Sequence, residues 1–317
     1  MIDVPYIPED FGPHYPAALH AGENLYTEWP ELVRCAIMVG KPSQFFSPMP
    51  NWFTLELTYR AFVLLANLDS DPATGLLTQS TAFRLLDPSE KGAVSYFLGL
   101  AFAKLFTERV FEVSELVHLA VFGNRLNPVY RPNIKSRPDL VGVNKRNDVV
   151  VVEAKGRSRA VPDDLMAKGK NQVRMLRKIG GRYPVLRLVS AIGFAKDFMQ
   201  VILRDPDDIG ENLIDIDISQ SQLREQYYRP LRELLAHSGD VYWISARNQR
   251  FLCYRSPLLD LTIGLREDLL PHELQAHDYL RDLNRDSLDN DHLNIGLDGV
   301  ICILGEIPRS SQLQPTA

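Results

Sequence analysis

Two carboxylates and a lysine stand close together in the middle of the chain. Asp139 is followed, after a gap of 13 residues, by Glu153, and Lys155 lies two positions further on. Residues two apart on a strand point to the same side of the sheet, so the side chains of Glu153 and Lys155 are expected to lie on the same side. Crowded carboxylates repel unless a cation neutralises them, and Mg²⁺ prefers oxygen ligands. Bound Mg²⁺ polarises a phosphate and lowers the pKa of a water, while a nearby lysine stabilises transition-state charge. These residues therefore predict hydrolysis of a phosphodiester.

The local sequence predicts a β-hairpin that carries these groups. Two β-branched runs, DLVGV (139–143) and DVVVVE (148–153), flank four polar residues that suit a turn. A symmetric turn would set Asp139 opposite Val152, one residue short of Glu153. A bulge or an asymmetric turn would bring the two carboxylates side by side. The second run is apolar on both faces, which predicts a central strand.

The pattern resembles a known superfamily. The letters PD ending at Asp139, followed by Glu153-Ala154-Lys155, resemble the PD-(D/E)xK motif of restriction-endonuclease-like nucleases. The resemblance implies an α/β fold with an αβββαβ core around a small mixed sheet, dependence on Mg²⁺ (with Mn²⁺ as a substitute), and hydrolysis of nucleic acid. It also implies that Asp139 and Glu153 bind the metal, that the backbone carbonyl of Ala154 adds a ligand, and that Lys155 is the catalytic lysine.

Two further residues follow from the same resemblance. Glu90 stands where members of the superfamily often carry another acid near the start of the first helix, and Gln172 stands where many carry a glutamine after the lysine strand. The alternatives are that Glu90 only favours the positive end of a helix and that Gln172 is an ordinary surface residue. Glu108, Glu112 and Glu115 compete with Glu90 for the role of the additional acid.

A basic segment surrounds the motif. Residues 125–187 contain 16 Lys and Arg against 5 Asp and Glu, a net charge of +11 in a protein whose net charge is -5. Such asymmetry suits a polyanionic partner; the alternative is a solvated surface paired with acidic parts of the same chain. Lys170, Arg174, Arg177 and Lys178 recur at helical spacing and predict a basic stripe. The predicted nucleic-acid-binding residues are Arg157, Arg159, Lys168, Lys170, Arg174 and Arg177.

Hydrophobic periodicity and turn residues divide the chain into three segments. We expect a mainly helical region at 1–87, the nuclease core at 88–205 and an acidic α+β region at 206–317. The expected helices cover 51–67, a segment beginning near Pro88 with Ser89 as N-cap, 162–179 and 220–237. The expected strands cover 115–122, the hairpin, 185–194, 241–244, 251–254 and 299–304.

Several function classes lack support in the sequence. The three cysteines are far apart and give neither a disulfide framework nor a zinc motif. No secretory signal, long apolar span, serine-hydrolase motif or nucleotide-binding loop stands out, so we expect a cytoplasmic protein without membrane contact. The leading hypothesis is a DNA endonuclease. Such an enzyme would suit defence against foreign DNA, and cutting of both strands would favour a homodimer. The alternative is a non-catalytic nucleic-acid-binding or scaffold subunit that keeps the fold and works through a partner.

Overall fold

The computed structural model describes residues 1–13, 15–40, 50–126, 137–205, 214–256, 258–275 and 281–305. Its α-helices are α1 (Ala18–Ala21), α2 (Trp29–Met38), α3 (Pro50–Asn67), α4 (Thr81–Leu85), α5 (Pro88–Phe111), α6 (Asp163–Arg174), α7 (Gln220–His237) and α8 (His272–Gln275), with short 3-10 helices η1 (Leu119–Leu126) and η2 (Glu267–Leu269). Its strands up to the middle of the chain are β1 (Ile2–Glu9), β2 (Glu23–Thr27), β3 (Leu68–Ser70), β4 (Leu77–Gln79), β5 (Glu115–His118), β6 (Leu140–Val143), β7 (Val149–Gly156), β8 (Leu176–Ile179) and β9 (Leu186–Ala195). The remaining strands are β10 (Phe198–Arg204), β11 (Ile214–Ile216), β12 (Val241–Ala246), β13 (Gln249–Arg255), β14 (Leu261–Arg266), β15 (Asp282–Asn284), β16 (Leu293–Ile295) and β17 (Val300–Leu304).

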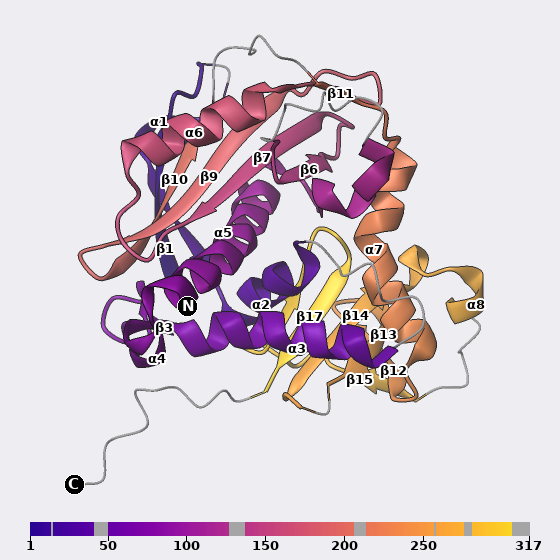
Figure 1. Ribbon diagram of the computed structural model, residues 1–317. Coiled ribbons are helices and arrows are strands. Elements are labelled where there is room, and N and C mark those ends of the chain that lie inside the picture. The colour runs from indigo at the N-terminus through magenta and orange to yellow at the C-terminus, as the bar shows by residue number, and fades with distance from the viewer. Residues whose placement is uncertain are drawn as a thin grey trace, which may run out of the picture.

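A mixed sheet forms the main framework of this α/β protein (Figure 1). Its strands lie in the order β2-β1-β10-β9-β7-β6-β5, and β4 pairs with β10 beside this path. Strands β5, β6 and β7 are antiparallel neighbours, whereas β7 and β9 run parallel and are connected through α6. The chain order across this region is therefore α5, β5, β6, β7, α6 and β9, with the short β8 between the last two.

The hairpin between β6 and β7 closes with an asymmetric turn. Val143 pairs with Val149, so five residues rather than four separate the paired positions. Asn147 adopts a positive φ of 65°, and the Asn144 side chain accepts a hydrogen bond from the Asp148 amide. Asparagine tolerates this left-handed backbone conformation better than most residues do. The extra residue shifts the register by one, which is the condition under which Asp139 comes opposite Glu153.

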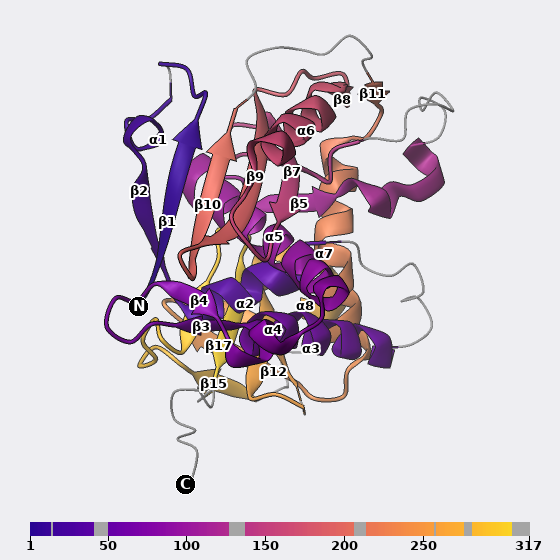
Figure 2. The ribbon, with the colours of Figure 1, turned by 60° about the vertical axis from the view of Figure 1, so that its left-hand side comes forward.

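Helices α5 and α6 cover opposite faces of the sheet, as Figure 2 shows. Gly156 lies against the backbone of Ser95 in α5, and Gly169 of α6 lies against Val189 of β9. Val189 pairs with Glu153, three residues before Gly156, and positions an odd number apart on a strand face opposite sides. The strand ends that carry the motif thus lie between two helices.

The predicted N-cap of α5 is wrong by two residues. Asp87, not Ser89, is the N-cap, and its side chain accepts hydrogen bonds from the Ser89 and Glu90 amides. Glu90 completes a capping box by accepting a bond from the Asp87 amide at 3.1 Å. Pro88 then occupies the first helical position, where its missing N–H costs nothing.

The helix predicted over 162–179 is also wrong at its end. Helix α6 stops at Arg174, and the chain continues as β8, which pairs in parallel with β11. Leu176 and Ile179 are buried in the core from this strand. Their spacing of three residues is compatible with a helix. The segment forms a strand instead because it pairs with Ile214–Ile216, which is distant in sequence.

The first and last segments of the chain pack onto the central one. Strand β1 runs parallel to β10 and places the first residues in the main sheet. The C-terminal strands form a second sheet in the order β15-β12-β13-β14-β17-β16, and α2 packs against both α5 and β17. One continuous apolar core contains residues of all three predicted segments. The helices expected at 51–67 and 220–237 are confirmed, as are strands in the three expected C-terminal ranges.

A buried network of charges joins these segments. Arg34 of α2 donates to Glu108 of α5 at 2.9 Å and to Asp298, beside β17, at 3.0 Å. Lys104 also contacts Glu108, at 2.6 Å, and Tyr227 of α7 donates to Asp298. All four charged side chains are almost fully buried, so each depends on its partners for solvation. Within the described residues, no helix has the length and apolarity needed to cross a membrane.

Candidate active site

The two motif carboxylates meet where β6 begins. Asp139 immediately precedes β6, and its amide donates to Oε2 of Glu153 at 3.1 Å. In return, the Ala154 amide donates to Oδ2 of Asp139 at 3.3 Å. These reciprocal bonds hold the two side chains together across the hairpin. The structure thus brings Asp139 and Glu153 side by side.

Lys155 and Gln172 complete a four-residue cluster. The Lys155 ammonium donates to Oε1 of Glu153 and to Oε1 of Gln172, the latter at 2.8 Å. The Gln172 amide nitrogen lies 3.4 Å from the carbonyl oxygen of Arg137, which it approaches as a donor. Gln172 therefore bridges α6, the end of β7 and the segment leading to Asp139. Its contacts differ from those of a solvated surface glutamine.

Burial gives the cluster unusual acid-base properties. Burial, followed by the charge of Asp139, raises the pKa of Glu153 to about 8. The Lys155 ammonium and the Asp139 amide act in the opposite direction, but burial outweighs them. Burial likewise raises the pKa of Asp139. Strongly perturbed carboxyl groups beside a fixed cation are frequent at functional sites.

The structure separates Glu90 from this cluster. Its exposed carboxylate caps the start of α5, and in the described residues it has no contact with Asp139 or Glu153. The alternative interpretation, that Glu90 only favours the positive end of a helix, agrees with this capping contact. A role of Glu90 at the metal stays a prediction. The other acids that competed with Glu90 also have partners of their own. Glu108 belongs to the buried charge network, and Glu112 pairs with Lys145. Glu115 accepts from Tyr228 at 3.1 Å.

The predicted basic stripe is not one helical face. Because α6 ends at Arg174, Arg177 and Lys178 lie on β8 instead. Arg177 pairs with Asp215, and the Lys178 ammonium lies 4.6 Å from the ring centre of Tyr183. The predicted stripe is therefore wrong as a continuous feature.

The remaining basic candidates differ in their surroundings. Lys170 pairs with Asp10 at 2.6 Å, and Lys168 pairs with Asp164 at 2.8 Å. Arg174, the last residue of α6, is half-buried. Arg157 and Arg159 are exposed and lie two and four residues after Lys155, just beyond the end of β7.

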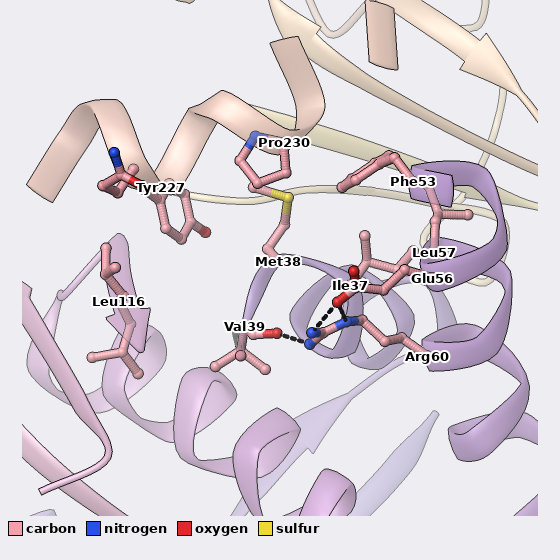
Figure 3. A pocket seen from close by; sticks show the side chains of 13 residues that line it. Ile37, Met38, Val39, Phe53, Glu56, Leu57, Arg60, Leu116, Tyr227 and Pro230 are labelled. Carbon is pink, nitrogen blue, oxygen red and sulfur yellow. Dashed lines mark hydrogen bonds and ion pairs between the residues drawn. The ribbon is translucent and has the colours of Figure 1, made fainter. Parts of the chain in front are cut away.

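Figure 3 shows a pocket elsewhere in the chain's packing. It is lined from α2, α3, β5 and α7, and shares no residue with the motif. On one wall, Arg60 donates to the carbonyl of Val39 and to the carboxylate of Glu56. The cavity volume of about 30 Å³ leaves room for water only. This pocket offers no space for a substrate.

The donor set at the cluster fits Mg²⁺. Asp139 and Glu153 supply carboxylate oxygens, the type of ligand that Mg²⁺ prefers, and each already accepts a backbone amide that holds it in place. No group of three or more His, Cys, Asp or Glu suited to a metal occurs among the described residues. A site with two carboxylates suits Mg²⁺, which commonly keeps several waters and takes substrate phosphate oxygens. The Ala154 carbonyl as an additional ligand stays a prediction.

Comparison with protein-family models, curated proteins and solved structures found no match for this chain. The assignment of a function therefore rests on the residues and on the geometry of the cluster.

Proposed function

We propose that the protein is a Mg²⁺-dependent nuclease of the restriction-endonuclease-like type that hydrolyses phosphodiester bonds, with DNA as the favoured substrate. The observation that carries the proposal is the four-residue cluster of Asp139, Glu153, Lys155 and Gln172, in which a buried carboxylate, a half-buried carboxylate and an ammonium converge. The order α5-β5-β6-β7-α6-β9 supports it, because an αβββαβ order is what the motif implies.

The proposed chemistry divides among the residues of the cluster. Asp139 and Glu153 would hold the metal, which when bound polarises the phosphate and lowers the pKa of a water. Lys155 supplies a positive charge beside the carboxylates and stabilises the extra negative charge that develops on the phosphate. Gln172 fixes the Lys155 ammonium by accepting a hydrogen bond from one of its three N–H donors. A role in defence against foreign DNA, and dimerisation for double-strand cutting, belong to the same proposal.

Electrostatic attraction would bring the substrate to this edge of the sheet. Arg157 and Arg159 extend from the strand that carries Glu153 and Lys155, and both are exposed. Arginine on a protein surface neutralises phosphates and releases counterions, which favours nucleic-acid binding at low salt. The pair between Lys168 and Asp164 is compatible with this, because both side chains are exposed, and exposed ion pairs are weak and exchange partners easily.

A cleavage assay tests the proposal. Purified protein is incubated with plasmid, linear duplex, single-stranded DNA and RNA, with Mg²⁺, with Mn²⁺ and with EDTA. We expect cleavage of DNA that requires the metal and that Asp139→Asn abolishes, because the substitution removes a charged ligand. The matched control is Asp163→Asn, an exposed acid at the start of α6. Metal-independent binding without cleavage by the wild type would favour the non-catalytic subunit instead.

A further inference from the structure

A tyrosine and a histidine lie beside the carboxylate pair. Tyr96 of α5 follows Ser95, whose carbonyl lies against Gly156 at the end of β7. His118 is the last residue of β5, and the next amide, that of Leu119, donates to the carbonyl of Asp139 at 2.8 Å. The Tyr96 hydroxyl lies 3.3 Å from Nε2 of His118. The pair thus stands at the same strand ends as the cluster.

The hydrogen bonds of His118 fix the direction of the proton between the two rings. The Ala120 amide donates to Nδ1 of His118 at 3.1 Å. A backbone N–H only donates, so Nδ1 carries a lone pair, and the proton of the neutral imidazole is on Nε2. Nε2–H therefore donates to the oxygen of Tyr96. His118 is only 8% exposed, so its ring is held in this orientation by its surroundings.

The Tyr96 hydroxyl proton then points away from His118. Tyr96 is 42% exposed, and its hydroxyl has no acceptor among the residues that the structure describes. Burial and the charge of Asp139 raise the pKa of Tyr96, so the phenol keeps its proton at neutral pH. The Tyr96 hydroxyl is therefore a hydrogen-bond donor near two carboxylates. A polyanion that approaches these carboxylates needs neutral or positive groups to contact.

We propose that Tyr96 is a substrate-binding residue of this site, whose hydroxyl donates to a phosphate of the nucleic-acid strand beside the bond that is cut. This inference rests on the proposed nuclease function. A strand carries one phosphate per about 3.4 Å of helix axis, so a strand placed at Asp139 and Glu153 presents neighbouring phosphates to the same sheet edge. His118 is a positioning residue that orients the phenol.

The test compares Tyr96→Phe with the wild type. The substitution removes the hydroxyl and keeps the ring, which packs edge-to-face on Phe97 at 5.5 Å. Binding of a fluorescent DNA strand is measured by anisotropy in EDTA, and cleavage by steady-state kinetics in Mg²⁺. We expect Kd and KM to rise about 10-fold, with kcat within about twofold of the wild type, because the contact is made in the ground state as well. Tyr26→Phe, an exposed tyrosine on the edge strand β2, is the control and should change neither.

The histidine gives a second comparison. His118→Gln keeps a nitrogen donor near the position of Nε2 and should retain much of the wild-type affinity, whereas His118→Ala should weaken binding as Tyr96→Phe does. Thermal melting shows whether each variant is folded.

The outcomes separate this inference from the function on which it rests. Wild-type Kd and KM in folded Tyr96→Phe, with cleavage still lost in Asp139→Asn, would overturn the role of Tyr96 and leave the nuclease proposal intact. A fall in kcat alone, at unchanged Kd, would also overturn it as a binding contact. Failure of the wild type to bind or cleave nucleic acid would overturn both.

Discussion

Replacing Glu153 by glutamine should stabilise the metal-free protein at neutral pH and above. Burial and the neighbouring Asp139 raise the pKa of Glu153 from its ordinary value of 4.5 to about 8. Between these two values the folded protein keeps a proton that the unfolded chain has lost. The contribution of this group to the free energy of unfolding is therefore fully present below pH 4.5 and is lost as the pH rises through 8. Each pH unit in this window removes about 1.4 kcal/mol.

The glutamine variant should escape this loss, because its amide does not ionise. Between pH 5.5 and pH 7.5 the free energy of unfolding of the wild type should fall by about 2–3 kcal/mol relative to Glu153→Gln. The difference between the two proteins reports on Glu153 and its interaction with Asp139, since all other titrating groups are shared. Urea unfolding in EDTA, followed by fluorescence at several pH values, measures it.

A matched control and a metal titration sharpen this experiment. Glu273→Gln, at an exposed position of α8, should follow the wild type at every pH. Adding Mg²⁺ at pH 8 should raise the melting temperature of the wild type more than that of Glu153→Gln, because a metal that binds the ionised carboxylate stabilises the folded state. Parallel stability curves for Glu153→Gln and the wild type across pH 5.5 to 7.5 would refute the reasoning, since Glu153 would then titrate as an ordinary acid.

Three other perturbations have definite expected results. Gln172→Ala should lower kcat about 10–100-fold with little change in KM, because the amide only holds the Lys155 ammonium; unchanged kinetics would make the contact incidental. The double variant Arg157→Ala with Arg159→Ala should reduce the slope of log K against log salt by about 2 if each arginine contacts one phosphate, and an unchanged slope would assign both to solvent. Asp298→Ala should lower the free energy of unfolding by about 3–5 kcal/mol, because it leaves the buried arginine of the charge network without one partner. The exposed pair of Asp260 with Arg255 serves as control, and Asp260→Ala should cost no more than about 0.5 kcal/mol in the same urea experiment.

The sequence predicted the cluster well because its members are local. Asp139, Glu153 and Lys155 belong to one hairpin, and strand periodicity alone aligns the last two. The sequence left open only the geometry of the turn. The turn is asymmetric, with Asn147 in the left-handed conformation, and it shifts the register of the hairpin by one residue. Gln172 came from resemblance to a family rather than from spacing, and the structure places it on Lys155.

The errors arise where distant contacts outweigh local preference. The apolar residues in 176–179 have helical spacing, yet this segment forms a strand because it pairs with β11. The strand expected over 115–122 ends at His118, and the chain continues as η1. Strand β1 pairs with β10, almost two hundred residues later, which no local pattern near the N-terminus reveals. The contact between Tyr96 and His118 is likewise a product of packing, because these residues are 22 positions apart and no recognisable spacing links them.

The central claim is that the ammonium of Lys155 acts on a phosphodiester in the transition state. The most direct measurement is the single-turnover rate of DNA cleavage at saturating enzyme and Mg²⁺ for Lys155→Ala, compared with the wild type and with Lys168→Ala. Lys168 is an exposed lysine of α6 that pairs with the exposed Asp164. Because saturating enzyme removes any contribution of Lys168 to DNA binding from the rate, this variant controls for the loss of one positive charge. The account predicts that Lys155→Ala lowers the rate about 10²–10³-fold while DNA binding stays close to that of the wild type. Equal rates for folded Lys155→Ala, Lys168→Ala and wild-type proteins would contradict it and would place the activity elsewhere in the molecule.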